Sequence, residues 1–253
     1  MTETSEGTLL WEPPAELRDN AVITRYMKWL RENRDLSFDD YGELWKWSVN
    51  DVEGFWASLW EFLEVKASKP YERVLTKREM PASEWFPGAE LNYAEHAFRN
   101  AREDEPALVH RSELRPLAET SWAELREKTA ALTAALQAMG VGRGDRVVAY
   151  MPNVAEAVVA FLACASIGAV WSSTSPEFGF GAVLDRLAQI EPKVLFAVDG
   201  YRYGGKDYDV TDAVARLQGE MPSLEKTVVL PYLKEEPNVS DLENVVFWDE
   251  LLS

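Results

Sequence analysis

Two cations and a glycine pair follow closely after the apolar run at 193–198: Arg202, Gly204, Gly205 and Lys206. Guanidinium and ammonium groups pair with phosphates, and glycine amides, with no side chain above them, can approach a bound anion closely. The tyrosines beside them are suited to a stackable base. The pattern therefore fits a phosphate site next to a base, but a solvent-exposed turn explains the same residues equally well.

A second polar segment, with the sequence SSTSP, spans 172–176. In open parallel sheets ligands bind beyond the carboxyl ends of the strands, where hydroxyl groups can donate to phosphate or carboxylate oxygens. The same hydroxyls can instead cap the next helix, with Thr174 or Ser175 at the N-cap position. From the local sequence alone we favour the helix cap.

Other patterns in the sequence do not predict a catalytic or metal-binding site. Gly140, Gly142 and Gly144 have the spacing of a dinucleotide fingerprint, but they follow a helical pattern and precede a strand, the reverse of what that motif requires. One cysteine and two histidines cannot form a Cys/His zinc cluster, and no Walker-type phosphate loop occurs. We interpret Cys164, which lies inside an apolar helical run, as a buried structural thiol.

The elements that must position these residues alternate between strands and helices. Strands are predicted over 146–151, 169–173, 193–198 and 227–230. Helices are predicted between them: one that starts with an N-cap pair at Asn153 and Glu156 and stops at Gly168, and others over 181–190 and 209–218. This order predicts a parallel sheet with right-handed crossovers, and so an α/β fold.

A hairpin and a long helix are predicted to precede this sheet. Strands at 107–110 and 117–120 flank a polar turn. Ser121 and Glu124 then have the spacing of a capping box, in which the serine oxygen accepts from the glutamate amide and the glutamate reaches back. The helix that they begin is expected to end at Gly140 in the left-handed conformation.

Residues 1–100 have a different composition, because they contain seven of the ten tryptophans. They are predicted to form a helical, tryptophan-rich region. Apolar residues at helical spacing predict helices over 21–32 and 51–65, a helix start at 37–41 and a short helix at 91–100. Such short helices need a surface to cover. We expect their rings to pack against the rest of the protein, the alternative being an aromatic cage for a ligand.

The chain has 253 residues and a formal net charge of -17. This acidic balance repels phosphate backbones, so we expect no nucleic-acid binding, although a local basic pocket can still hold one phosphorylated ligand. The N-terminus lacks the basic and apolar parts of a signal peptide, and the longest apolar run is shorter than the roughly 20 residues that cross a bilayer. We therefore expect a soluble, cytoplasmic protein without membrane contact.

Several motifs, taken in order, resemble the acyl-CoA synthetases of the adenylate-forming superfamily between Trp85 and Phe247. They are Trp85–Gly88 with Leu91–Asn92, Thr120–Leu125, Gly144–Val147 and Met151–Asn153. Other segments resemble the acetoacetyl-CoA synthetase family more than the acetyl-CoA synthetases. These are Leu10–Trp11, Tyr26–Leu30, Leu44–Val49, Gly54–Trp56, Trp171–Gly179 and Gly205–Tyr208.

The resemblance implies a ligase that activates acetoacetate with MgATP to an acyl-adenylate, releases pyrophosphate, and transfers the acyl group to coenzyme A. In related synthetases the segment matching Arg202–Gly205 contacts the phosphorylated adenosine end of coenzyme A. By this resemblance, Arg202 is expected to pair with a phosphate of coenzyme A, and Gly204 and Gly205 are expected to let the backbone approach that ligand closely. Related acetyl-CoA synthetases have a second arginine where Gly205 stands, and Lys206 could replace it as a point charge.

The resemblance also implies that residues 101–253 form an incomplete AMP-binding domain. The family's phosphate loop, adenine site, ribose-binding aspartate and C-terminal lid match nothing in this sequence, so no catalytic residue or metal ligand is assigned. We expect these 253 residues to be inactive alone, and acetoacetate-dependent pyrophosphate release would contradict that. The alternatives are a non-catalytic, partner-binding or regulatory fragment that associates through a surface its missing half would cover, and part of a different short-chain acyl-CoA synthetase.

Overall fold

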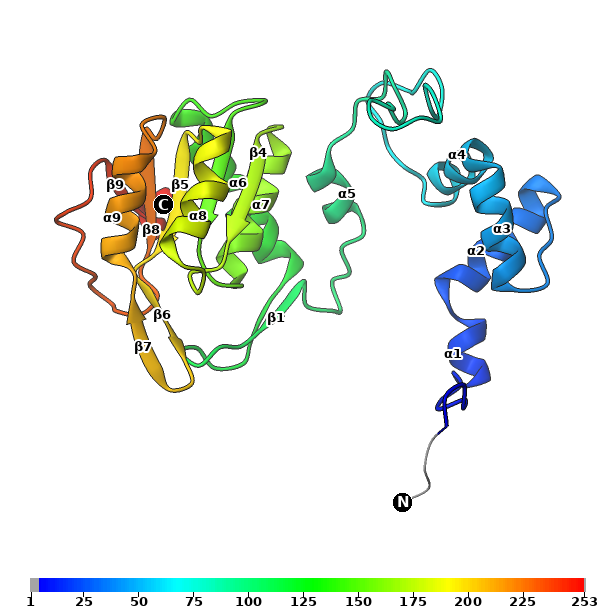
Figure 1. Cartoon of the computed structure of the whole chain (residues 1–253), viewed down its shortest axis with the longest axis horizontal. Coiled ribbons are helices and arrows are strands. Elements are labelled where there is room, and N and C mark those ends of the chain that lie inside the picture. Colours follow the sequence, from blue (N-terminus) through cyan, green and yellow to red (C-terminus); the bar gives the residue numbers. More distant parts are fainter. Residues whose placement is uncertain (1–4, 253) are drawn as a thin grey trace. The chain divides into compact units, whose positions relative to one another are not determined.

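The computed structural model describes residues 5–252. The chain divides after Leu91 into two compact units, called here the N-terminal unit and the α/β unit, and each is described by itself. Figure 1 shows helices without a sheet in the first and a sheet with helices in the second. None of the helices within the described range is long and apolar enough to cross a membrane.

The regular structure of the N-terminal unit consists of helices: α1 (Ala15–Asp19), α2 (Val22–Arg34), α3 (Tyr41–Asn50) and α4 (Val52–Phe62). Aspartates begin the last two, because Asp40 accepts from the Glu43 amide at 2.9 Å and Asp51 from the Gly54 amide at 3.0 Å. The helix predicted over 21–32 is present as α2, and the one predicted over 51–65 ends three residues earlier.

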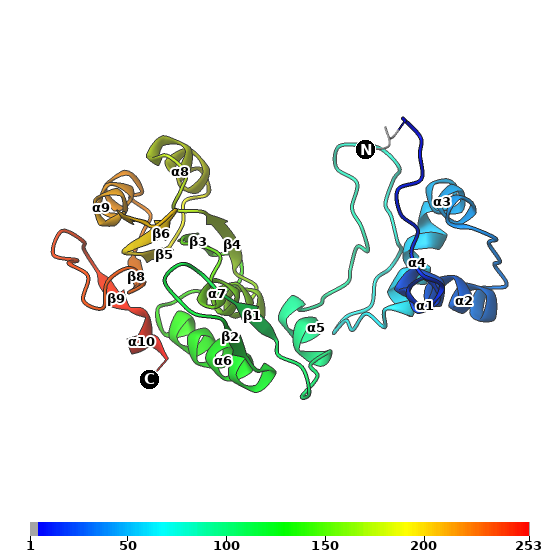
Figure 2. The same ribbon diagram turned by 90° about the horizontal axis from the view of Figure 1, so that it is seen from below.

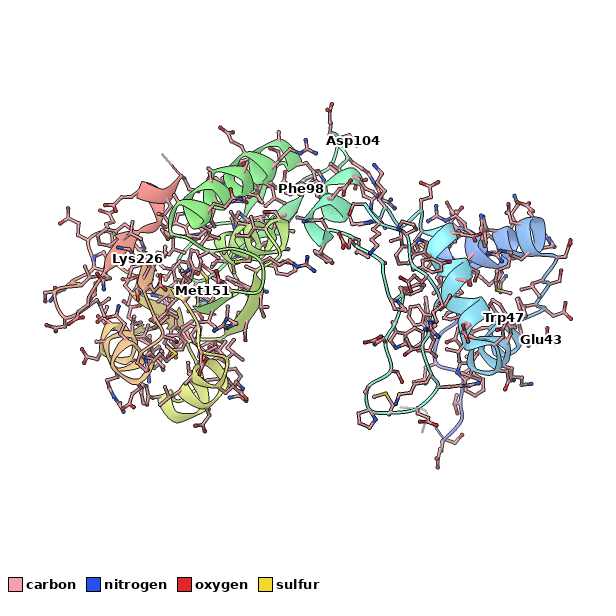
Figure 3. The ribbon with its side chains drawn as sticks, turned by 90° about the horizontal axis from the view of Figure 1, so that it is seen from above. Glu43, Trp47, Phe98, Asp104, Met151 and Lys226 are labelled. Carbon is pink, nitrogen blue, oxygen red and sulfur yellow. The ribbon has the colours of Figure 1, made fainter. Side chains whose placement is uncertain are left out.

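The aromatic side chains of this unit pack on one another around the buried residues Tyr26, Leu30 and Leu44. The ring of Tyr26 lies 5.0 Å from Phe62, and its hydroxyl bonds to the buried Ser58 hydroxyl at 2.6 Å. Trp47, labelled on α3 in Figure 3, is half-buried in the same cluster. The rings therefore form a small core of their own within the N-terminal unit.

A five-stranded parallel sheet is the centre of the α/β unit, in the order β4-β3-β5-β8-β9. Its strands are β3 (Arg146–Tyr150), β4 (Val170–Thr174), β5 (Val194–Val198), β8 (Lys226–Leu230) and β9 (Val245–Phe247). Every residue of the central strand β5 is buried, as a strand covered on both faces should be. The predicted α/β fold with a parallel sheet is thus confirmed.

Helices cover both faces of this sheet, as Figure 2 shows. One face carries α6 (Trp122–Ala138), α7 (Ala155–Ser166) and the short α10 (Trp248–Leu251), with α5 (Tyr93–Arg99) against α7. The other face carries α8 (Phe180–Leu187) and α9 (Thr211–Glu220). A single core of aliphatic side chains fills the space between the helices and the sheet.

Cys164 lies in this core and is fully buried on α7. Burial raises the pKa of its thiol to about 12, because the thiolate would lose its hydration. A thiol that stays protonated is a poor nucleophile, which agrees with the structural role expected for Cys164.

The predicted hairpin and long helix precede the sheet. β1 (Leu108–His110) pairs antiparallel with β2 (Ala118–Thr120). Helix α6 begins after Ser121, whose hydroxyl accepts from the Glu124 amide at 3.1 Å, so the serine half of the capping box is formed. The Glu124 carboxylate binds the Lys128 ammonium at 2.7 Å, and this hydrogen bond lowers the pKa of Glu124.

Three features of this unit differ from the prediction. Val154, which has no capping side chain, is the N-cap of α7, and the Glu156 carboxylate pairs with Arg115 at 2.8 Å, so Asn153 and Glu156 do not form the predicted N-cap pair. The last strand and helix, β9 and α10, were not expected. Helix α9 begins at Thr211, two residues later than predicted.

Candidate functional site

The segment after β5 is a β-hairpin. Strand β6 (Gly200–Tyr203) pairs antiparallel with β7 (Lys206–Asp209), and a two-residue turn joins them at Gly204 and Gly205. Both glycines have positive φ, 59° and 73°, which a tight hairpin turn of this length needs at both positions and which glycine adopts without strain. The glycine pair therefore lies at the tip of a projecting ribbon (Figure 1).

The buried carboxylate of Asp199 holds the base of the hairpin. It accepts from three consecutive amides of the segment after β8: Tyr232 at 2.6 Å, Leu233 at 2.9 Å and Lys234 at 2.8 Å. A fully buried carboxylate needs such partners, because desolvation without them is costly. Gly200, the next residue, has no room for a side chain, since a Cβ there would lie 2.5 Å from both Leu233 and the Tyr208 carbonyl.

A second contact fastens the end of β7 to the same segment. The Lys234 ammonium donates to the Asp209 carboxylate at 2.6 Å, and the Thr211 amide donates to Asp209 at 2.9 Å. Burial alone would raise the pKa of Asp209, but the hydrogen bonds from Lys234 and Thr211 outweigh it and lower the pKa to about 2. The hairpin thus projects from a base that is fixed at both of its strands.

Arg202 pairs across the hairpin with Asp207, its direct neighbour in register, through two hydrogen bonds of 2.5 and 3.1 Å. This ion pair raises the pKa of Arg202 and lowers the pKa of Asp207. Residues opposite each other in an antiparallel pair share a face, and successive residues alternate. Arg202 and Lys206 therefore lie on opposite faces of the hairpin, one on each side of the glycine turn.

Glu113, in the connection between β1 and β2, completes the tip of the hairpin. Its two carboxylate oxygens accept from the Gly204 and Gly205 amides, each at 2.8 Å. Consecutive amides that converge in a turn form a concave anion site, and here the anion is a carboxylate of the same chain. The exposed Lys206 forms no ion pair among residues 5–252.

The hairpin tyrosines lie on the face that carries Lys206. Tyr201 and Tyr208 stack on each other, with ring centroids 5.0 Å apart and planes 11° apart. Burial, and then the nearby Glu177 and Tyr208, raise the pKa of Tyr201. The side chain of Tyr203, nearer the tip, is 64% exposed and has a ring face open to a planar ligand.

The segment 172–176 does not cap a helix. Thr174 is buried at the end of β4, and its hydroxyl donates to the Ala149 carbonyl at 3.4 Å. Helix α8 begins at Phe180, with Gly179 as its N-cap, so the predicted cap at Thr174 or Ser175 is wrong. The segment lies against the end of β3, where the Met151 amide donates to the Thr174 carbonyl at 3.2 Å. Met151 is labelled in Figure 3.

A groove of about 780 Å³ lies in the N-terminal unit, along α2 and the start of α3. The apolar side chains Ile23, Met27 and Phe38 line it together with charged ones, and the ammonium of Lys28 at its rim pairs with Glu32 at 3.8 Å. None of the residues predicted to bind a ligand lines this groove. Volume alone therefore does not identify a site there, and the hairpin tip remains the better candidate.

Comparison with known proteins places the chain in a family. The sequence profile of the family described as "AMP-binding enzyme" matches residues 94–249. The chain belongs to the AMP-binding enzyme family. A second profile, "Acetyl-coenzyme A synthetase N-terminus", matches residues 41–97, next to the AMP-binding enzyme region.

Relatives of this chain include an acetoacetyl-CoA synthetase of Danio rerio, 39% identical over 99% of this chain and 38% of its own length. An acetoacetyl-coenzyme A synthetase of Rhizobium meliloti is 38% identical over 88% of this chain and 34% of its own length. The solved structure of the acetoacetyl-CoA synthetase from Streptomyces lividans matches with a TM-score of 0.89 and 46% identity, over 96% of this chain and 38% of that one. The chain thus spans less than two fifths of the length of these relatives.

Two residues of the site were not predicted from the sequence: Glu113 and the anchor Asp199. Glu113 lies 91 residues from the turn that it binds, in what reads only as a polar turn. Asp199 had a local signal, because an acidic residue directly after a fully apolar strand is expected to be buried and to need donors. The loop residues that supply those donors, at 232–234, lie beyond the hairpin, α9 and β8.

Proposed function

We propose that this chain is part of an acetoacetyl-CoA synthetase and that it supplies a contact for coenzyme A. In that reaction the acetoacetate carboxylate displaces pyrophosphate from ATP to form an acyl-adenylate. The coenzyme A thiol then displaces AMP and gives acetoacetyl-CoA. The substrate assignment is supported by the relatives and the solved structure, which carry this name.

The observation that carries the proposed contact is the pair of amides at the hairpin tip. Gly204 and Gly205 direct both N–H groups at one pair of oxygens, 2.8 Å away, which is the geometry a phosphate needs. A Cβ at either glycine would meet nothing within 4 Å, so no other group crowds the turn on that side, and the two amides themselves bind Glu113. Arg202 on one face and Lys206 on the other supply positive charge.

The residues present fit some of the implied ligands and not others. The hairpin tip fits a phosphate of coenzyme A, and Tyr203 offers a ring to its adenine. Within residues 5–252 no group of three or more His, Cys, Asp or Glu side chains could hold a metal ion, so no Mg²⁺ ligand is assigned. What this chain contributes is binding and orientation of coenzyme A.

Isothermal titration of the 253-residue protein tests this proposal. Coenzyme A should bind, and 3′-dephospho-coenzyme A, which lacks the phosphate on the adenosine ribose, should bind more weakly. Arg202→Ala should weaken coenzyme A binding roughly tenfold, because it removes a charged partner of the phosphate.

The matched control is Arg143→Ala. Arg143 is an exposed arginine in the turn before β3, so it lies at the amino end of the sheet, opposite the end from which the hairpin projects. The control removes the same charge and should leave binding unchanged. Equal affinities for the two forms of coenzyme A, or equal effects of the two arginine substitutions, would reject the proposed contact.

A further inference from the structure

The Gly204–Gly205 turn already binds an anion, and that anion is the side chain of Glu113. Each carboxylate oxygen accepts from one amide, at 2.8 Å in both cases. The carboxylate therefore presents two oxygens to the turn, as a phosphate would. Both donors that a phosphate would use at this turn are occupied.

The loop that carries Glu113 is held in place on both sides of it. The Ser112 hydroxyl accepts from the Leu114 and Arg115 amides at 3.2 and 3.0 Å. The Arg115 guanidinium pairs with Glu156 at 2.8 Å and lies 4.7 Å from the ring centre of Tyr232. Glu113 therefore reaches the hairpin from a fixed loop, so its effective concentration at the turn is high.

The contact itself is exposed, which makes it replaceable. Glu113, Gly204 and Gly205 are all exposed to solvent, so a competing anion can reach the amides without any unfolding. Hydrogen bonds between exposed groups compete with water and contribute little to stability. The hairpin base, held by the buried Asp199, does not depend on Glu113.

We propose that Glu113 is the resident anion of the hairpin turn, which a phosphate-bearing ligand must displace, and that it thereby determines the affinity and selectivity of this site. The inference rests on the proposed coenzyme A contact. A bound phosphate and a seated Glu113 carboxylate would compete for the same two amides and repel each other. Only a group that binds the amides better than an intramolecular carboxylate is admitted, which favours a phosphate dianion over a monoanion.

Coenzyme A titrations of Glu113 variants test the affinity. Glu113→Ala should bind coenzyme A roughly five- to tenfold more tightly than the wild type, because the amides are free. Glu113→Asp keeps the charge but is one methylene shorter and cannot bridge both amides, so it should also bind more tightly, though less so than Glu113→Ala. Glu119→Ala, which removes an exposed carboxylate from β2 of the β1–β2 pair that the Glu113 loop connects, should change the affinity less than twofold.

Inorganic phosphate tests the displacement without coenzyme A. In wild-type protein it should shift the amide resonances of Gly204 and Gly205 and the carboxyl carbon resonance of Glu113 together. In Glu113→Ala the two glycine amides should respond at a several-fold lower phosphate concentration. The resonances of the free variant also show whether the hairpin is still folded.

The outcomes separate the two proposals. If Arg202→Ala weakens coenzyme A binding while Glu113→Ala leaves it unchanged or weakens it, Glu113 is a structural strut and this inference is wrong. The inference is also wrong if phosphate shifts the glycine amides equally in wild type and Glu113→Ala. If coenzyme A binds to neither protein but phosphate responds as expected, the displacement holds and the coenzyme A contact is rejected.

Discussion

Both units of the chain contain helices with one apolar face, but the two units build different cores from them. In the N-terminal unit, aromatic rings surround a few buried residues, and rings such as Trp45 (53% exposed) and Trp56 (42%) remain partly in solvent. In the α/β unit, aliphatic side chains fill a continuous core, with Leu132, Leu136 and many others fully buried. A sheet offers two broad faces to cover, whereas short helices offer only narrow stripes to one another.

The two cores are therefore sensitive to different substitutions. The N-terminal core depends on a few large side chains in edge-to-face contact, for example Trp47 with Phe55 at 5.8 Å and 80°. The α/β core distributes its stability over many contacts, and it also tolerates buried polar anchors such as Asp199 and Thr227 at its strands. The candidate site lies in the α/β unit, where the packed sheet and its buried anchor hold the hairpin rigidly.

The largest effect is expected from Phe196→Ala in the α/β unit. Phe196, 1% exposed on β5, lies between the rings of Trp171 at 6.1 Å and Trp248 at 5.8 Å. Its loss should lower the free energy of unfolding of this unit by about 3–5 kcal/mol. Urea unfolding followed by circular dichroism should show the shift, whereas tryptophan fluorescence, which comes mostly from the N-terminal unit, should shift less. Equal shifts in both signals would mean that the units unfold as one.

Leu30→Ala makes the reverse test in the N-terminal unit. Leu30 is 0% exposed on α2, so its truncation should lower the free energy of unfolding of this unit by about 3 kcal/mol. Here the fluorescence transition should move more than the circular dichroism transition, to which the helices of both units contribute. Leu17→Ala on α1, where the side chain is 58% exposed, is the control and should have little effect.

Asp199→Asn probes a buried charged anchor of the α/β unit, where the N-terminal core has only the neutral hydroxyl pair of Tyr26 and Ser58. The amide can accept fewer of the three backbone hydrogen bonds and turns a donor toward them, so we expect a loss of about 2 kcal/mol. Hydrogen exchange should also speed up at the Tyr232, Leu233 and Lys234 amides. Unchanged exchange at these amides would show that the hairpin base does not depend on Asp199.

The smallest effect is the pH dependence of the ion pair between Asp209 and Lys234. The folded-state pKa of Asp209 is about 2, below its ordinary value of 3.8. The carboxylate therefore contributes its full stability above about pH 4, and this contribution is lost as the pH falls toward 2. Because both side chains are largely exposed, the amount is small. The stability difference between wild type and Asp209→Asn should be present at pH 5 and mostly lost by pH 2; a constant difference would contradict the lowered pKa.

Much of the fold follows from local patterns in the sequence. Continuous apolar runs such as 193–198, separated by helical patterns, predict the parallel sheet because strands buried on both faces have that composition. Strands β6 and β9 were missed for physical reasons. In β6 only Gly200 is buried while Arg202 and Tyr203 are exposed, and β9 has no residue that is fully buried, so neither has a burial pattern to detect.

The candidate site was only partly predictable. The glycine pair and its flanking cations are visible locally, since Gly204 and Gly205 mark a turn whatever surrounds it. The pairing of Arg202 with Asp207 and the opposite faces of Arg202 and Lys206 depend on the hairpin register. Glu113 depends on tertiary structure that brings a distant loop to the turn, and no local pattern encodes such a contact.

We propose above all that the Gly204–Gly205 turn binds the phosphate on the adenosine ribose of coenzyme A. The most direct measurement is the chemical shift of these two amides in the 253-residue protein. With coenzyme A both resonances should move in a saturable way, and with 3′-dephospho-coenzyme A they should move far less. If coenzyme A shifts other resonances to saturation while those of Gly204 and Gly205 stay in place, the ligand binds elsewhere and the account is wrong.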